Sequence, residues 1–347
     1  MAPPAAGQPL AQVNLARALL ALGQEAKARQ LAERALAAAS TDTQVAVIAA
    51  EILNHGVPKW QFDVVRDHAR NAAYDAALVR AIQPGMIVLE IGTGSGILAM
   101  MAARAGASQV ITCEVNPTIA AMASNNIARN DYADRIKVVI KHSSELNIEA
   151  DLGRPADLLV SEIVSNSILS EDVLPVIEHA TRALLRPGGT VIPARAIARV
   201  ALAWSETVAH YHIGTVDGFD LSALNHLAPP RWRLKVGDRG LELASEPEDL
   251  FLFGFRTDDR HRASIANVAL TANGRRANCL VQWVKLEMDE QGTYENRPAL
   301  GATSNWAVLA YPLRRPAVPG PGDQVRIHGS HDRYDMRLWT DFPESRD

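Results

Sequence analysis

Val88 to Leu98 read VLEIGTGSGIL, an apolar run followed by three alternating glycines and the start of a second apolar run. The first run is typical of a buried strand, and the residues after the glycines are typical of a helix. Gly92, Gly94 and Gly96 then lie in the connecting turn, where backbone can approach a ligand without side-chain obstruction. A dinucleotide fingerprint would have its third glycine at Ile97, so nicotinamide binding is disfavoured. A tight strand-to-helix connection without a ligand is the structural alternative.

Short apolar strands alternate with helices on both sides of this turn. That alternation predicts a doubly wound parallel sheet, so the fold class is α/β and Rossmann-like. The predicted strands are 86–91, 109–114, 136–140, 156–162 and 189–193, and the predicted helices are 61–82, 97–105, 117–130 and 169–185.

The pattern differs at the two ends of the chain. From Pro193 onward apolar and polar residues alternate, with turn-forming clusters between the runs, which predicts an antiparallel β domain. Residues 13–39 predict two amphipathic helices broken at Gly23, a short hairpin that resembles one tetratricopeptide unit. A simple helical brace is the alternative. The predicted domains are a helical segment 1–57, a Rossmann-like domain 58–194 and a β-barrel domain 195–347.

Composition bounds the partners and the compartment. The 347 residues are 48% hydrophobic and 21% charged with a net charge of -4, which is typical of a globular enzyme and untypical of a dedicated nucleic-acid binder. Residues 1–12 lack a targeting pattern, and no apolar stretch approaches the about 20 residues of a membrane span. Cys113 and Cys279 are too far apart in sequence to suggest a disulfide framework or a metal site. We expect a cytoplasmic protein without metal, nucleic-acid partner or membrane attachment.

Acidic residues follow two of the predicted strands. Glu114 ends the strand after the glycine turn, where a carboxylate can accept hydrogen bonds from both hydroxyls of a ribose. A surface acid at a strand end is the alternative. Glu145 follows the third strand, where it can accept from the amino group of an adenine while the Ser144 backbone frames the ring. These positions predict an adenosyl cofactor.

Residues 88–107 resemble the first cofactor motif of the protein arginine methyltransferase family, and the resemblance covers about residues 58–340. Residues 60–78 are similar to the family's D-x-x-R-x-x-x-Y helix, here Asp67, Arg70 and Tyr74. The resemblance implies a class I methyltransferase domain that binds S-adenosyl-L-methionine, followed by a β-barrel. It assigns cofactor binding to Glu90 and the motif glycines, and assigns the methionine carboxylate to Arg70, whose guanidinium can bind it bidentately.

Two loops of the sequence resemble the family's catalytic loops. SEIVSNSILSE carries Glu162 and Glu171 nine residues apart, as in the family's double-glutamate loop, although it lacks the Met and Gly-Tyr that many members have between them. A pair of helix-capping acids is the alternative. TSNWAVLAYPL resembles the Thr-His-Trp loop, with Trp306 at the aromatic position and Asn305 in place of histidine. Asparagine can hydrogen-bond but cannot carry charge, so an ion pair with the loop acids is lost.

The chemistry of a guanidinium explains why two carboxylates are needed. Its pKa above about 12 and its delocalised lone pairs make it a poor nucleophile. Two carboxylates that accept hydrogen bonds from its other nitrogens draw positive charge away from the attacking nitrogen. We expect Glu162 and Glu171 to do this, with Trp306 packing on the guanidinium plane.

The sequence leaves the acceptor, the product and the assembly open. Protein arginine is the default acceptor, and free arginine or another small guanidino metabolite is the alternative. A non-catalytic adaptor is a third reading. Two branches of the family are resembled by different parts of the chain. The monomethylating branch is most similar in the segments GTGSGILAMM, KHSSE and SEDVLPVIEHA. The helical repeats ahead of the core resemble a branch that forms symmetric dimethylarginine. Family members dimerise through an arm early in the barrel, so the resemblance implies a possible homodimer. The corresponding stretch here, 226–249, is shorter than usual.

Overall fold

The computed structural model describes residues 9–57, 60–256 and 259–341. The chain divides into two compact units, Met1–Lys59 and Trp60–Asp347. The predicted helical, Rossmann-like and barrel segments also include residues 1–8, 58–59, 257–258 and 342–347, which lie outside the described residues. Most of residues 1–12, which were predicted to lack a targeting pattern, therefore also lie outside the described residues.

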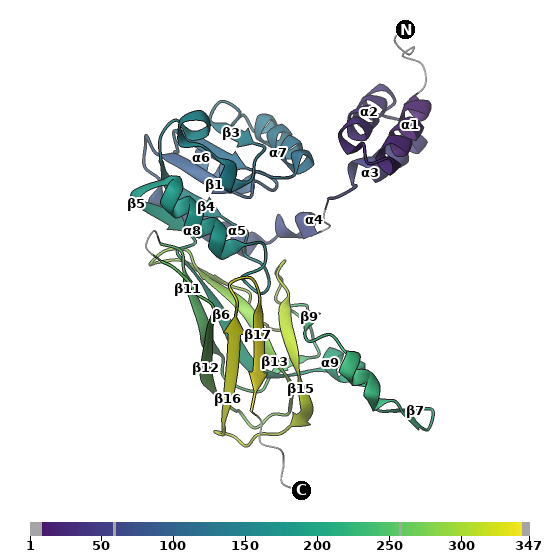
Figure 1. Cartoon of the computed structure of the whole chain (residues 1–347), viewed down its shortest axis with the longest axis vertical. Helices are drawn as coiled ribbons and strands as arrows, with labels where there is room; N and C mark the ends of the chain where they lie inside the picture. The colour runs from purple at the N-terminus through teal and green to yellow at the C-terminus, as the bar shows by residue number, and fades with distance from the viewer. Residues whose placement is uncertain (1–8, 58–59, 257–258, 342–347) are drawn as a thin grey trace. The chain divides into compact units, whose positions relative to one another are not determined.

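The described part of the first unit is a small bundle of three helices (Figure 1). Gly23 has φ 72°, which lets the chain turn sharply between the two predicted helices. A third helix, not predicted from the sequence, begins after Asp42, whose carboxylate accepts hydrogen bonds from the backbone of Gln44 and Val45. Ala28, Ala32 and other small residues form the core between them. The helices are α1 (Pro9–Ala21), α2 (Glu25–Ala38) and α3 (Thr43–Leu53).

The second unit begins with the predicted parallel sheet, whose strand order is β3-β2-β1-β4-β5. The order reverses between β1 and β4, and Ile91 at the end of β1 pairs with Ser161 at the end of β4. Ligands of such sheets bind at this reversal, beyond the carboxyl ends of the strands. The strands are β1 (Ile87–Ile91), β2 (Gln109–Cys113), β3 (Ile136–Val139), β4 (Ala156–Ser161) and β5 (Leu185–Ile192). The connecting elements are α6 (Ile97–Arg104), α7 (Pro117–Arg129), η1 (Ser143–Glu145), η2 (Ile148–Leu152) and α8 (Val173–Ala183).

The helix predicted over 61–82 is divided in the structure into α4 (Trp60–Val64) and α5 (His68–Ala81). Asp67 stands before α5 with its side chain accepting a hydrogen bond from the backbone of Arg70, so α5 starts there. The helix predicted over 169–185 likewise begins only at Val173. Asp172 ahead of it has φ 57°, a left-handed conformation that a helix cannot include.

The antiparallel domain is barrel-like, as predicted, and its strands stand together in Figure 1. Its larger sheet has the order β10-β6-β13-β15-β9, with β11 pairing with β6 and β14 with β13, and β12-β16-β17 form a second sheet. The strands are β6 (Arg195–Ser205), β9 (Trp232–Leu234), β10 (Leu241–Leu243), β11 (Glu248–Gly254), β12 (Ser264–Thr271), β13 (Ala277–Glu287), β14 (Thr293–Glu295), β15 (Val308–Ala317), β16 (Gln324–His331) and β17 (Met336–Thr340).

A projecting segment leaves the barrel between β6 and β9, and Figure 1 shows α9 and β7 standing away from the barrel strands. The arm was expected over 226–249, but most of that stretch forms β9, β10 and the start of β11 in the sheet. The sequence misplaced it because the projecting residues are short elements without a clear apolar period. They are α9 (Glu206–Tyr211), β7 (Thr215–Val216), β8 (Phe219–Asp220) and η3 (Ser222–Leu227).

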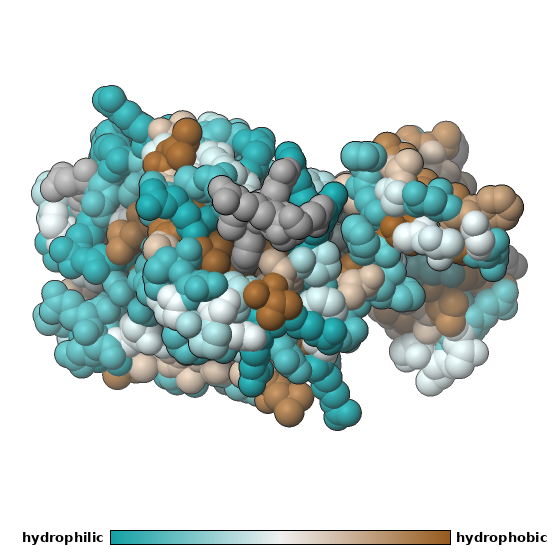
Figure 2. Space-filling model, turned by 90° about the horizontal axis from the view of Figure 1, so that it is seen from below, coloured by the Kyte–Doolittle hydropathy of each residue, from teal (hydrophilic) through white to brown (hydrophobic). Residues whose placement is uncertain are grey.

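On the face shown in Figure 2, hydrophobic residues are interspersed among hydrophilic ones. Over the described ranges, none of the helices combines the length and the apolar character that crossing a bilayer requires.

Candidate active site

The three motif glycines form the turn between β1 and α6, as predicted. Gly92, Gly94 and Gly96 have φ values of 86°, 50° and 83°, all in the left-handed region that favours glycine. A Cβ atom on Gly92 would lie 2.9 Å from Cγ2 of Ile163. The turn therefore packs closely against residues 162–171, which we call the glutamate loop.

Two acids border the turn. The Glu114 carboxylate accepts hydrogen bonds from the backbone N–H of Gly94 at 3.2 Å and of Asn116 at 3.0 Å, which fixes it beside the glycines. Glu90 on β1 is buried, and its Oε2 has no hydrogen-bond partner in the described structure. Burial raises the pKa of Glu90 to about 8, and Glu114 adds to that rise while a hydrogen bond with Thr112 opposes it.

The predicted adenine contacts lie in η1. Ser144 and Glu145 are exposed, and the His142 ring caps this short helix, with Nδ1 2.7 Å from the Ser144 hydroxyl. Their contact with an adenine ring stays a prediction.

An adenosyl cofactor with a charged amino-acid tail fits these residues. Glu90 presents a buried carboxylate oxygen without a partner, and the glycine turn leaves no room for a Cβ at Gly92. Arg70 is buried, and its guanidinium lies at the same end of the sheet. Glu114 retains acceptor capacity for a ribose.

Arg70 pairs with the first acid of the glutamate loop. Its Nη1 lies 2.9 Å from Oε2 of Glu162, and the two side chains are 3% and 14% exposed. Nη2 donates to the carbonyl of Val64 and to Oδ1 of Asn71, both at 2.8 Å. Arg70 therefore links α5 to the glutamate loop.

Burial sets the protonation of Glu162. It raises the pKa of Glu162 to about 7, the Arg70 guanidinium opposes that rise, and Glu171 adds to it. Tyr74 fixes the strand end before Glu162, because its buried hydroxyl donates to the Ser161 carbonyl at 3.0 Å.

Glu171 stands at the exposed rim of the loop. Its carboxyl group is partly desolvated, which raises its pKa, and Glu114 adds to this rise. Its backbone has φ 70°, and Ile168 and Asp172 are left-handed as well, with φ 70° and 57°. Residues with side chains rarely adopt this conformation. The backbone that carries the Glu171 carboxylate is therefore strained.

Asp67 connects α5 to residues 304–306, which we call the tryptophan loop. Its Oδ1 accepts from Arg70 N, and its Oδ2 accepts from three barrel groups. These are Tyr294 Oη at 2.6 Å, Ser304 Oγ at 3.0 Å and Asn305 N at 3.2 Å. Asn305 thus meets the site through its backbone, and the catalytic role of its side chain stays a prediction.

Trp306 is 5% exposed and is held at several points. Its N–H donates to Ser304 Oγ at 3.1 Å, and its carbonyl accepts from Asn296 Nδ2 at 3.1 Å. The next residue, Ala307, donates its N–H to Asn166 Oδ1 of the glutamate loop at 2.6 Å. The structure therefore brings the glutamate and tryptophan loops together. Sequence reasoning did not assign Tyr294, Ser304 or Asn166, and only the D-x-x-R motif pointed to Asp67.

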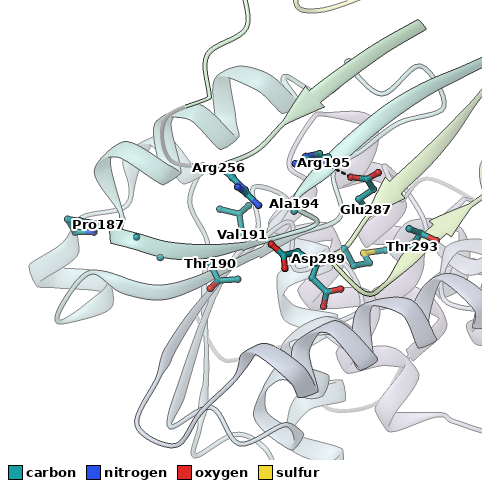
Figure 3. A pocket seen from close by; sticks show the side chains of 13 residues that line it. Pro187, Thr190, Val191, Ala194, Arg195, Arg256, Glu287, Asp289 and Thr293 are labelled. Atoms are coloured by element: carbon teal, nitrogen blue, oxygen red, sulfur yellow. Dashed lines mark hydrogen bonds and ion pairs between the residues drawn. The ribbon is translucent and has the colours of Figure 1, made fainter. Parts of the chain in front are cut away.

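Another cavity, of about 840 Å³, lies where β5 meets the turn between β13 and β14 (Figure 3). Arg195 and Glu287 form an ion pair of 2.9 Å in its wall, and Arg256 and Asp289 also line it. None of the predicted site residues is among the described residues that line this cavity. It is separate from the candidate active site.

Comparisons with known proteins agree with this geometry. A family model for ribosomal protein L11 methyltransferase (PrmA) matches residues 72–199. The chain is 36% identical to an arginine N(omega)-methyltransferase of Streptomyces achromogenes subsp. streptozoticus, over 98% of this chain and 92% of the relative. It is 28% identical to protein arginine N-methyltransferase 7 of Drosophila grimshawi, over 80% of this chain. The chain spans only 46% of that longer protein.

A solved structure shares the fold. A chain of the Trypanosoma brucei PRMT1 enzyme-prozyme heterotetrameric complex with AdoHcy superposes with a TM-score of 0.73 and 21% identity, covering 83% of this chain and 95% of that one. The Rossmann-like domain followed by a barrel-like domain is therefore common to both.

Proposed function

Because this chain belongs to the arginine N-methyltransferase family, we propose that its acceptor is a terminal guanidinium nitrogen of free arginine. The chain is an S-adenosyl-L-methionine-dependent enzyme that methylates arginine. One observation carries the choice of acceptor: the relative that matches nearly from end to end is named for arginine rather than for protein arginine.

The methyl donor supplies an electrophilic methyl group on a sulfonium. The chain's own residues prepare the acceptor nitrogen. Glu162, buried and fixed by Arg70, and Glu171 at the loop rim accept hydrogen bonds from the other guanidinium nitrogens. A nitrogen–carbon bond forms as the sulfur–carbon bond breaks, and S-adenosylhomocysteine and one proton leave. Trp306, fixed between Ser304 and Asn296, offers its ring face to the guanidinium plane.

Arginine in a protein is the second candidate acceptor. It is favoured by the 28% identity to protein arginine N-methyltransferase 7 and by the PRMT fold. Because this chain spans only 46% of that longer protein, the substrates of that protein are a weaker guide than those of the relative matched over nearly its whole length.

A parallel assay separates the candidates. Purified protein is incubated with methyl-labelled S-adenosylmethionine and either free arginine or an arginine- and glycine-rich peptide, and products are identified by mass spectrometry. We expect methylarginine from the free amino acid, with the mass giving the number of methyl groups. Methylation of the peptide alone would replace the free-arginine proposal with the protein one. The Glu162→Gln variant serves as the control for contaminating activity.

We also propose that the chain forms a homodimer through the projecting segment. Phe219 is 70% exposed, Leu224 51% and Leu227 82%, and monomeric proteins rarely expose such clusters. Sedimentation should show a dimer that Phe219→Glu with Leu227→Glu converts to a monomer. Leu22→Glu changes a similarly exposed leucine, 73% exposed in the turn after α1, as the matched control. A monomer only after the Leu22 change would assign the contact to the helical unit instead.

A cytoplasmic location stays part of this proposal. It is supported by Cys113 and Cys279, both buried free thiols, which suit a reducing compartment. Cell fractionation with an antibody to the chain would test it, and recovery outside the cytoplasmic fraction would reject it.

A further inference from the structure

We propose that Tyr294 and Ser304 are positioning residues for the methyl transfer, which fix the tryptophan loop against Asp67 and so set the position of Trp306 beside the acceptor. We call the acceptor site proposed beside Glu162, Glu171 and Trp306 the arginine slot. The proposal assigns a role to two hydroxyl groups of the barrel. It rests on the proposed function in that arginine is the acceptor used to test it.

The carboxylate of Asp67 is the fixed point of this arrangement. Asp67 is 7% exposed, and a buried carboxylate needs hydrogen-bond donors in place of water. Its two oxygens have separate tasks. Oδ1 accepts from Arg70 N at the start of α5, whereas Oδ2 accepts only from groups of the barrel domain.

The two hydroxyls form a closed triangle with Oδ2. Tyr294 Oη lies 2.6 Å from Oδ2 and 2.7 Å from Ser304 Oγ, and Ser304 Oγ lies 3.0 Å from Oδ2. Hydrogen bonds to an ionised acceptor are stronger than those between neutral groups. Removing either hydroxyl therefore costs more free energy than the loss of a hydrogen bond between neutral groups.

The triangle reaches Trp306 by two routes. Ser304 Oγ accepts the N–H of Trp306 at 3.1 Å, which fixes the backbone below the indole. The Tyr294 ring stands against the Trp306 ring with centroids 5.6 Å apart and planes at 64°, an edge-to-face contact that fixes its tilt. Removing either hydroxyl therefore weakens the link between the indole and Asp67.

The anchors of the loop outside the triangle remain when the hydroxyls are lost. Asn296 still accepts a hydrogen bond from Val284 N on β13 and donates one to the Trp306 carbonyl. Asn166 Oδ1 still accepts one from Ala307 N. Arg70 N also keeps Asp67 Oδ1. The cofactor side of the site should therefore be retained while the acceptor side loosens. A purely structural role would affect both.

The test compares Tyr294→Phe and Ser304→Ala with the wild type. We expect the KM for arginine to rise about tenfold in each variant, as the loss of a charge-assisted hydrogen bond implies, with kcat changed much less. The Kd for S-adenosylhomocysteine, measured by calorimetry, should stay within about twofold of wild type. Ser304→Thr keeps the hydroxyl and should restore the wild-type KM.

Tyr311→Phe is the matched control, because it removes a buried phenol hydroxyl on β15 that has no hydrogen-bond partner among the described residues. An equal KM rise in this control, or a KM unchanged in both test variants, would overturn the proposal. So would an equal loss of S-adenosylhomocysteine affinity. If Tyr294→Phe does not fold, Ser304→Ala and Ser304→Thr decide the question. Absence of arginine turnover in the wild type would instead refute the proposed acceptor, and the same comparison would then use the peptide.

Discussion

Replacing Glu162 by glutamine removes one negative charge from the arginine slot while keeping the size of the side chain. Opposite charges about 4 Å apart attract by about 4 kcal/mol at an effective dielectric of about 20. The Glu162 side chain is only 14% exposed, so little of this attraction is screened by solvent. Since about 1.4 kcal/mol corresponds to tenfold, kcat/KM for arginine should fall about a thousandfold.

The assay measures initial rates of label transfer to arginine from pH 6 to pH 9. The pKa of Glu162 is about 7 in the free enzyme, and only the ionised form holds a guanidinium. Wild-type kcat/KM should therefore rise as pH increases through about 7, and Glu162→Gln should lose this inflection. Glu178→Gln is the control, because it removes the same charge from an ion pair with Arg333 outside the site. A Glu162→Gln variant within tenfold of wild type at pH 8 would refute the assigned role.

Three further variants test the cofactor side and the slot wall. In the folded protein the pKa of Glu90 is about 8, against an ordinary value of 4.5. Without ligand, the free energy of unfolding should therefore fall by several kcal/mol as pH rises from 4.5 to 8. Glu90→Gln should show a flatter dependence on pH, and a dependence parallel to that of the wild type would contradict the assigned burial of the Glu90 proton. Gly92→Ala would place a Cβ 2.9 Å from Ile163 and should weaken S-adenosylhomocysteine binding at least tenfold in calorimetry, whereas Gly85→Ala, with φ 89° and open space, should not. Trp306→Ala should raise the KM for arginine about thirtyfold, the equivalent of about 2 kcal/mol, and an unchanged KM would remove the ring from the slot.

Short-range patterns in the sequence predicted the sheet, its glycine turn and the barrel-like domain. The turn could be predicted because Gly92, Gly94 and Gly96 and the strand before them are adjacent in the chain. The cofactor class and the acceptor came from the family resemblance rather than from spacing alone. The third helix of the first unit was missed, although Asp42 before an apolar run is a capping signal.

Long-range contacts could not be predicted from such patterns. Asp67 and Tyr294 are 227 positions apart, and Asn166 and Ala307 are 141 apart. No local period reports a hydrogen bond across that separation. The break at Asp67 was missed for the same reason, because its carboxylate is held by barrel groups as well as by α5. The left-handed positions of the glutamate loop are not glycines, so the sequence does not indicate their backbone conformation.

The strained glutamate loop implies a trade-off between heat resistance and turnover. Ile168 and Glu171 in the loop, and Asp172 directly after it, adopt a backbone that costs each non-glycine residue about 1–2 kcal/mol. Glu171→Gly would relieve strain and remove the second carboxylate in a single step. Laboratory selection for thermostability alone would accept such a change, whereas selection for methylation would reject it. At this loop the demands of folding and of catalysis therefore act on the same residue in opposite directions.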